Sequence, residues 1–410
     1  MSAKDSRLSP LWRNSPHWMR NEESFPSVAK PRVIGGYSVG EENEFLDSLE
    51  NLKYLHLPEG DVNWDLNQGY EKYTGMIKET TRIDLLLRFI MKHRDKLRPS
   101  ENVPGRVLEA DFVCFRSVLT ELLCTPYEGK KFFKEWTIVA SKYRGTIYLY
   151  KLQRTQQDEE EKDDRKRRAG YYGYKYQQLI TTRDLDTPSD LSGTVIKQPF
   201  CVMFQSRFEH HRMLYSGGID AVLTDDPIDK NADLFETSLK FLDFHTKMAN
   251  MEERKFMKYK LRQWWCKNFT AGVETVYVGS RTQDGILEKI EAMSVEEMPT
   301  ISKTEWCASV CMGFLIEFLN LVKFVLKDMN DPASVALFSF NPHISTRVQY
   351  EILPEKTEMS FLPEWYVDFI EELCAVGENV PETTEAPEEI PETSEEIPDG
   401  VPEEIECCEI

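Results

Sequence analysis

Hydrophobic positions recur at two different spacings along this chain of 410 residues. Residues 82–97 place apolar side chains three and four positions apart, which is the spacing of an amphipathic helix. Helical spacing also occupies 255–269 and 310–326, and the second of these is so apolar that we expect it to be mostly buried. The chain therefore carries several helices whose apolar faces must pack against other parts of the fold.

Between these helices lie short segments rich in β-branched and aromatic residues, which predict strands. Residues 137–140 and 145–152 predict a hairpin with its turn around 141–144. Further strands are expected at 200–214, 219–223, 232–237 and 275–279. Because helices and strands are mixed without a regular βαβ alternation, we expect an α+β fold with mixed β-sheets flanked by helices.

The two ends of the chain differ from the middle. Residues 1–25 are polar and lack the apolar stretch of a secretory signal, so we expect a flexible leader. Residues 26–375 contain no long Gly/Ser linker and predict a single large domain. Residues 376–410 repeat Pro and Glu. Because the prolines block helix and sheet and the glutamate charges repel one another, we expect a disordered acidic tail. That tail is either solubilising or a docking segment for a protein partner.

The net charge of −20 comes largely from this tail. Residues 377–410 contain 13 acidic residues and no Lys or Arg, and without them 57 acidic residues face 50 basic ones, a charge of −7. A mildly acidic body permits nucleic-acid binding, because a local basic groove matters more than the total. The charged block 158–168 is expected to be a solvated loop, and its RKRR end is alternatively a nuclear-import patch.

The nine cysteines are scattered and form no CxxC pair. We therefore expect reduced thiols rather than a zinc site or a disulfide framework. No segment is expected to be long and apolar enough to span a bilayer, so no membrane partner is expected. Together these features favour an intracellular location, in the nucleus, the cytoplasm or both.

Six segments carry recognisable motifs: 111–128 (DFVCFRSVLTELLCTPYE), 173–177 (GYKYQ), 214–220 (LYSGGID), 260–273 (KLRQWWCKNFTAGV), 306–312 and 361–367. In this order they resemble the DXO-type decapping nucleases, over roughly residues 30–373. Members of that family process the 5′ ends of RNA. The resemblance implies a central active-site cleft and hydrolysis at phosphorus assisted by Mg²⁺ or Mn²⁺.

Two divalent cations about 4 Å apart can activate water and neutralise the charge that develops in such a reaction. Hard cations prefer carboxylate oxygens, which the family supplies from Glu and Asp residues of its motifs. At the three Glu positions this chain has Gln177, Gly218 and Leu234, whereas the motif's Asp is kept as Asp220.

In the same alignment, Glu236 stands where the family has a Lys, and Phe235 offers the backbone carbonyl. The resemblance thus implies Asp220, Glu236 and Gln177 as the catalytic and metal-ligating side chains. Because strand alternation would place Leu234 and Glu236 on one face, this alignment depends on the predicted strand at 232–237.

The resemblance also implies a set of substrate-binding positions: Phe115, Arg116, Ser117, Cys201 and Lys267. The guanidinium of Arg116 suits a 5′ phosphate, and its alternative is an ordinary salt-bridged arginine. Cys201 is alternatively a core residue. Lys267 replaces a Gln of the family, and an ion pair with Glu236 would explain that exchange. Trp264 and Trp265 are expected in the core.

Three functions remain open. The first is a metal-dependent hydrolase of RNA 5′ ends (cap removal, pyrophosphohydrolysis or 5′–3′ exonuclease), weakened or lost by the replaced ligands. The second is a pseudoenzyme that binds capped, triphosphate or monophosphate RNA. The third is a protein-interaction module that uses the acidic tail. None of them includes sequence-specific recognition of DNA.

Overall fold

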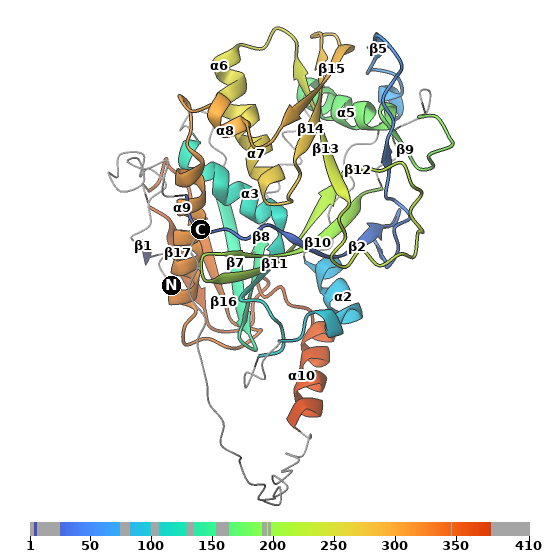
Figure 1. Ribbon diagram of the computed structural model, residues 1–410. Coiled ribbons are helices and arrows are strands. Elements are labelled where there is room, and N and C mark those ends of the chain that lie inside the picture. The colour runs from blue at the N-terminus through green and yellow to red at the C-terminus, as the bar shows by residue number, and fades with distance from the viewer. Residues whose placement is uncertain are drawn as a thin grey trace, which may run out of the picture.

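The structure, a computed structural model, describes residues 4–5, 25–73, 83–99, 106–128, 135–152, 164–190, 195, 198–345 and 347–378. It contains two mixed β-sheets with helices packed around them, which confirms the α+β prediction (Figure 1). The predicted leader and tail lie mostly outside the described residues. Within them, β1 (Lys4–Asp5) pairs with the edge of a sheet, and α10 (Glu364–Glu378) reaches three residues into the predicted tail.

The large sheet has ten strands in the order β1-β17-β16-β7-β8-β6-β11-β10-β2-β3. Its further strands are β2 (Arg32–Val39), β3 (Phe45–Leu46), β6 (Phe112–Phe115), β7 (Trp136–Tyr143), β8 (Thr146–Lys151), β10 (Phe200–Phe208), β11 (His211–Ile219), β16 (Val335–Phe340) and β17 (Gln349–Leu353). β6 pairs in parallel with both β8 and β11, and the remaining neighbours are antiparallel.

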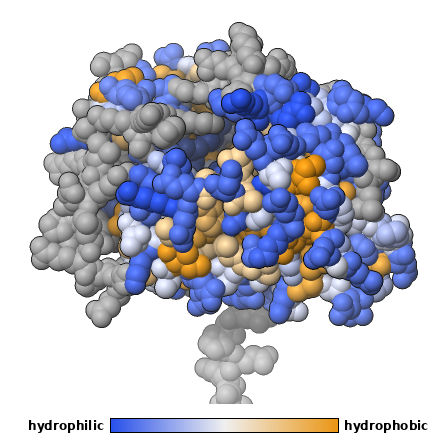
Figure 2. All heavy atoms as spheres, turned by 90° about the horizontal axis from the view of Figure 1, so that it is seen from above, coloured by the Kyte–Doolittle hydropathy of each residue, from blue (hydrophilic) through white to orange (hydrophobic). Residues whose placement is uncertain are grey.

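The small sheet has seven strands in the order β5-β15-β14-β13-β12-β4-β9. They are β4 (Tyr54–Leu55), β5 (Trp64–Asp65), β9 (Thr181–Thr182), β12 (Ala221–Leu223), β13 (Lys240–Met248), β14 (Thr275–Arg281) and β15 (Ile286–Ser294). This sheet lies toward the top of Figure 1. Figure 2 shows the molecule from above, where most of the coloured surface is hydrophilic and apolar side chains lie among the hydrophilic ones. A single residue, Asp220, connects β11 of the large sheet to β12 of the small one.

Both faces of the large sheet are buried, because alternate side chains enter different hydrophobic cores. On β6, Phe112 and Cys114 join the core formed with α3 (Arg116–Cys124), α7 (Arg262–Phe269) and α9 (Ala308–Val325). Val113 joins the core formed with α2 (Asp84–Lys92) and α10. A third core lies between α5 (Asp164–Leu179) and the small sheet. Each large apolar side chain buried in this way contributes about 1.5–3 kcal/mol.

Several predicted elements are confirmed. The amphipathic pattern at 82–97 forms α2 followed by a short 3-10 helix, Arg94–Lys96. The hairpin is formed by β7 and β8, and its turn lies at Arg144 and Gly145, which both have positive φ angles (45° and 76°). Two such residues match the twist of the flanking strands. The helical pattern at 255–269 is continuous, with a π-helical stretch, Phe256–Leu261, before α7.

Two predicted elements are wrong. Residues 232–237 form a turn rather than a strand, because the Asp233 carboxylate accepts the backbone N–H of Phe235 and Glu236 has a φ of 53°. Residues 164–168 are the first turn of α5 rather than a loop, since Arg168 pairs with Asp164 at 3.2 Å and lies over the ring of Tyr70. These arginine contacts are internal to the domain.

The expectation that no segment is long and apolar enough to span a bilayer is wrong for α9, an 18-residue helix with a mean hydropathy of 1.7. Its burial explains the composition, because 61% of the helix is covered by the rest of the fold. The seven cysteines within the described ranges are free thiols.

Candidate functional site

Two aspartates meet where the sheets join. Asp220 follows β11, and its backbone N–H donates to Leu242 on β13 at 3.2 Å. Asp243 is the next residue of β13, and its side chain is only 1% exposed. The two carboxylates interact strongly enough that the charge of Asp243 raises the pKa of Asp220. The junction of the two sheets thus concentrates negative charge in a buried position.

Protein donors already contact these carboxylates. For Asp220, Oδ1 accepts from Nε2 of Gln177 at 2.9 Å and Oδ2 from the backbone N–H of Phe244 at 2.8 Å. For Asp243, Oδ1 accepts from Nζ of Lys267 at 2.5 Å. Its Oδ2 makes no hydrogen bond within the described part of the chain, but lies 2.9 Å from Nε2 of His245. The ring of His245 is fixed by parallel stacking on Trp264, with centroids 4.4 Å apart.

The protonation of the two aspartates differs for physical reasons. Burial raises the pKa of Asp220 to about 7, and the neighbouring Asp243 adds to this shift. Burial also acts to raise the pKa of Asp243, but the positive charge of Lys267 and the contact with His245 lower it well below its ordinary value. Asp243 is therefore the ionised partner of a lysine, and Asp220 is the member of the pair that takes up a proton more readily.

Arg116 approaches the aspartates from the first turn of α3. Its Nη2 donates to the carbonyl of Gly218 at 2.5 Å, and its side chain lies flat against Gly217. A Cβ on Gly217 would stand 2.5 Å from Nε of Arg116, so only glycine leaves room for this arginine. The other terminal nitrogen, Nη1, is buried and has no hydrogen-bond partner among the described residues.

Two cavities open on either side of this centre, with volumes of about 1020 and 800 Å³. Arg116, Gly218 and Lys267 belong to the walls of both. Lys53, Gln177 and Asp220 line the first cavity. Phe115, Ser117 and Cys201 line the second. Because Gly218 has no side chain and a Cβ there would meet only the Phe200 carbonyl, at 3.8 Å, the space beside it is open.

The structure thus brings most of the predicted site together. Gln177, Gly218, Asp220, Arg116 and Lys267 surround one place in the fold. Gln177, however, turns its NH₂ group rather than its oxygen toward Asp220, which is the opposite of what a metal ligand requires. Trp264 and Trp265 are 4% and 3% exposed and belong to the core, as expected.

The predicted contribution of residues 234–236 does not agree with the structure, because these residues form a turn and line neither cavity. Leu234 is a buried core residue. Phe235 lies on the surface within 5.6 Å of the Arg32 guanidinium, and Glu236 pairs with Arg32 at 2.7 Å. The predicted ion pair between Glu236 and Lys267 is also wrong, since Lys267 pairs with Asp243.

The sequence alignment missed Asp243, His245 and Lys53. A signal for the first two was present, because an Asp inside the run Phe241–Phe244 and a His directly after it are unusual on a buried strand. Lys53 precedes the short strand β4 and carried no comparable signal. Burial lowers its pKa, and the charge of Asp220 acts in the opposite direction.

Divalent metals are implied by the resemblance, but the residues present do not fit them. In the described ranges, no three His, Cys, Asp or Glu side chains are placed to hold a metal ion. Three of the four oxygens of the aspartate pair accept hydrogen bonds from the protein. The ammonium of Lys267 already supplies positive charge to Asp243, and Arg116 adds a second cation beside the pair.

Comparison with known proteins agrees with the geometry. Residues 29–367 match the family model for RAI1-like PD-(D/E)XK nucleases. The chain is 29% identical to the decapping and exoribonuclease protein of Xenopus laevis over 363 residues, which cover 85% of this chain and 88% of that protein. It is 29% identical to the human decapping and exoribonuclease protein over 355 residues, covering 84% and 86%.

Solved structures show the same fold. Rai1 of Scheffersomyces stipitis, in complex with (3′-NADP)+ and a calcium ion, matches with a TM-score of 0.70 and 19% identity, covering 91% of this chain and 100% of that one. Rai1 of Candida albicans, in complex with pU5 and Mn²⁺, matches with a TM-score of 0.69 and 16% identity, covering 90% and 100%.

The name of the matched family describes an Asp followed along the chain by an Asp or Glu two residues before a Lys. Asp220 and the sequence Asp243-Phe244-His245 follow this spacing, with His245 in the place of the Lys. Together with the match over most of the domain, this arrangement shows that the chain belongs to the RAI1-like PD-(D/E)XK nuclease family.

Proposed function

We propose that this chain binds phosphorylated 5′ ends of RNA in the two cavities around Arg116, and that it does not hydrolyse them by a two-metal mechanism. The observation that carries the proposal is the buried Nη1 of Arg116. A buried donor without a partner costs about 1–3 kcal/mol, and more when it is charged. A phosphate oxygen is an acceptor that would remove this cost.

The charges around Arg116 support an anionic ligand. The walls of the first cavity carry equal numbers of both charges: the cations Lys53, Arg116, Arg183 and Lys267, and the carboxylates Glu41, Asp184, Asp190 and Asp220. Asp243 is buried beneath Lys267 and already paired with it. In the second cavity, four cations (Arg116, Lys151, Arg262 and Lys267) face two carboxylates (Glu121 and Glu128), so a 5′ phosphate there meets an excess of positive charge, which favours its binding. Relatives of this chain are named decapping and exoribonuclease proteins, and the Candida albicans relative is in complex with pU5.

The loss of two-metal hydrolysis is supported by two residues that replace carboxylates and by the lysine that occupies a third. Gln177 donates a hydrogen bond to Asp220, Gly218 offers no ligand, and Lys267 neutralises Asp243. A second candidate function is weak hydrolysis dependent on Mg²⁺ or Mn²⁺, because Asp220 and Asp243 still stand side by side. Relatives in complex with Mn²⁺ and calcium favour the same candidate.

A filter-binding assay with two RNAs of identical sequence, one with a 5′ monophosphate and one with a 5′ hydroxyl, tests the binding proposal. We expect the monophosphate to bind at least tenfold more tightly, and Arg116→Ala to abolish that preference. Arg207→Ala, which removes an exposed arginine outside both cavities, is the control. Equal binding of both RNAs, or an unchanged preference in Arg116→Ala, would contradict the proposal.

The same RNAs, together with triphosphate and capped forms, test hydrolysis in Mg²⁺ or Mn²⁺. We expect no metal-dependent product. Product formation that Asp220→Ala abolishes would instead establish the second candidate.

We further propose an intracellular location, in the nucleus, the cytoplasm or both, which is supported by the free thiols. A protein partner for the acidic residues 376–410 stays a proposal from composition alone, because nearly all of that segment lies outside the described residues.

A further inference from the structure

We propose that Lys267 takes the place of a divalent cation. Its ammonium neutralises Asp243, so that phosphate binding at this site needs no metal. Removal of the ammonium would convert the Asp220–Asp243 pair into a cation site. The part of this proposal that concerns phosphate rests on the proposed function. The part that concerns the cation site stands on the geometry alone.

The first argument is the position of the ammonium. Nζ of Lys267 lies 2.5 Å from Oδ1 of Asp243, whose side chain is 1% exposed, whereas the lysine side chain is 33% exposed and reaches the walls of both cavities. The lysine comes from α7 and the aspartate from β13, so that helix and sheet packing fix their separation. A cation is thus held on the carboxylate as a permanent part of the fold.

The second argument is the charge that an added ion would meet. A divalent cation beside Asp243 would stand close to the ammonium of Lys267 and to the guanidinium of Arg116, in a partly desolvated place where repulsion is weakly screened. It would also have to displace Nζ of Lys267 from Oδ1. A phosphate group meets the same cations with the opposite sign of interaction.

The third argument is what remains when the ammonium is absent. Oδ1 of Asp243 would lose its donor, and Oδ2 already lacks a hydrogen bond in the described part of the structure. Oδ2 would stay 2.9 Å from Nε2 of His245, and the freed Oδ1 would belong to a carboxylate next to Asp220, which lines the first cavity. Carboxylate oxygens are the ligands that Mg²⁺ and Mn²⁺ prefer, and the variant would offer one that no protein cation neutralises.

The test is a titration of the full-length protein with Mn²⁺ alone at neutral pH, followed by the electron paramagnetic resonance signal of the free ion. Relative to the wild type, we expect Lys267→Gln to bind one Mn²⁺ at least tenfold more tightly. Adding Asp243→Asn to Lys267→Gln should remove that gain. Lys258→Gln removes a lysine that lies over the ring of Tyr259 and belongs to neither cavity, so it is the matched control.

Wild-type protein that binds Mn²⁺ as tightly as Lys267→Gln would overturn the proposal, and so would a variant that gains no affinity. Lys267→Met removes the charge but keeps an unbranched side chain, and a melting curve for each variant shows which one is folded. In the variant that folds, added Mn²⁺ should raise the melting temperature, as expected for a ligand that binds only the native state.

A separate measurement addresses the phosphate. EDTA should leave the affinity of the wild type for 5′-monophosphate RNA unchanged, and a loss of affinity in EDTA would contradict the metal-free mode of binding. If the wild type binds no RNA under any condition, the proposed function fails. The Mn²⁺ titration would still decide whether Lys267 replaces a cation.

Discussion

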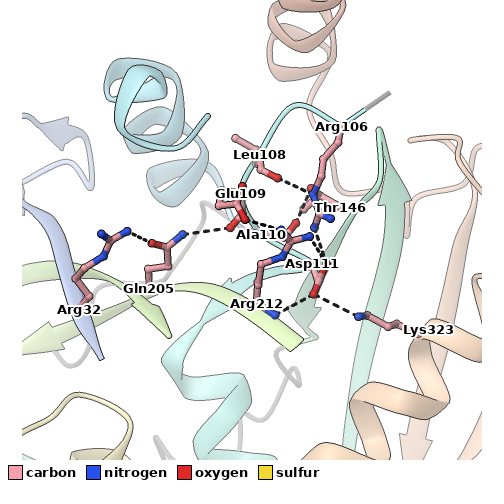
Figure 3. Close-up of polar contacts among 10 residues, drawn as sticks. All are labelled: Arg32, Arg106, Leu108, Glu109, Ala110, Asp111, Thr146, Gln205, Arg212 and Lys323. Carbon is pink, nitrogen blue, oxygen red and sulfur yellow. Dashed lines mark hydrogen bonds and ion pairs between the residues drawn. The ribbon is translucent and has the colours of Figure 1, made fainter. Parts of the chain in front are cut away.

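The two ends of strand β11 carry charged clusters of similar composition but opposite character. At the first end, Asp111 accepts from Nη2 of Arg106 at 2.5 Å and from the backbone N–H of Arg212 at 2.9 Å, and it pairs with Lys323 at 3.3 Å (Figure 3). At the other end, Asp220 and Asp243 lie beside Arg116, whose Nη1 has no hydrogen-bond partner in the described ranges.

The two clusters differ in whether their charged groups already have partners and in whether a ligand can reach them. The cations around Asp111 converge on a carboxylate that is 13% exposed, and neither cavity described above includes them. The cations around Asp220 line two cavities, and Nη1 of Arg116 can still donate a hydrogen bond to a ligand. Residue types alone do not distinguish a structural charge cluster from a binding site. A buried donor without a partner, on a residue that lines a cavity, does.

The comparison predicts that Asp111 matters for stability and not for ligand binding. Asp111→Ala leaves three cations near one another without their shared carboxylate, and it removes the acceptor of the Arg212 N–H. We expect the free energy of unfolding to fall by about 2–4 kcal/mol, which is typical for breaking a largely buried charge network. Urea denaturation measures this loss.

Asp225→Ala, at an exposed position, is the control for that experiment and should change the free energy by less than about 0.5 kcal/mol. The affinity of folded Asp111→Ala for 5′-monophosphate RNA should equal that of the wild type. A loss of RNA affinity without a loss of stability would reverse the assignment of the two clusters.

Much of the fold follows from the sequence because its elements obey strong periodicities. The apolar spacing of 82–97 and of 310–326 identified α2 and α9, and the β-rich runs around residue 144 identified the hairpin β7–β8. The turn at 232–237 could not be read in this way. Its conformation depends on one hydrogen bond that the Asp233 carboxylate accepts from the backbone N–H of Phe235, which competes with the strand pattern of the neighbouring apolar residues.

The site was predicted in part for the same reason. Arg116, Gln177, Gly218 and Asp220 lie in motifs with a fixed spacing, so their numbers could be assigned. Asp243 could not, because the alignment assigned its motif to Leu234, Phe235 and Glu236 on a strand that does not form. Its role depends on the pairing of β12 with β13, which places it beside Asp220, and this pairing is a tertiary contact that the local sequence does not encode.

The second prediction concerns the pH dependence of stability at the Asp220 end of β11. The pKa of Asp220 is raised to about 7 in the folded protein, so the native state keeps a proton that the unfolded chain has already released at lower pH. Its contribution to the free energy of unfolding therefore falls as the pH rises between roughly 4 and 7. His245 acts in the opposite direction, because burial lowers its pKa.

Asp220→Asn separates these effects because it keeps the neutral form at every pH. The free energy of unfolding of this variant minus that of the wild type should rise by about 1–3 kcal/mol when the pH is raised from about 5 to about 8. Urea denaturation at both pH values measures the difference, with Asp225→Asn as the control. If the free energy of unfolding depends on pH in the same way for Asp220→Asn and the wild type, the pKa of Asp220 is not raised in the folded protein.

The smallest expected effect compares two adjacent glycines at the open end of β11. A methyl group at position 217 would stand 2.5 Å from Nε of Arg116, whereas one at position 218 would meet only a carbonyl oxygen at 3.8 Å. Gly217→Ala should therefore displace Arg116 and weaken the binding of 5′-monophosphate RNA about tenfold, or about 1.4 kcal/mol. Gly218→Ala should leave it nearly unchanged. Equal losses in both variants would mean that the ligand contacts this strand directly and does not depend on the placement of Arg116, which would remove the distinction between the two ends of β11.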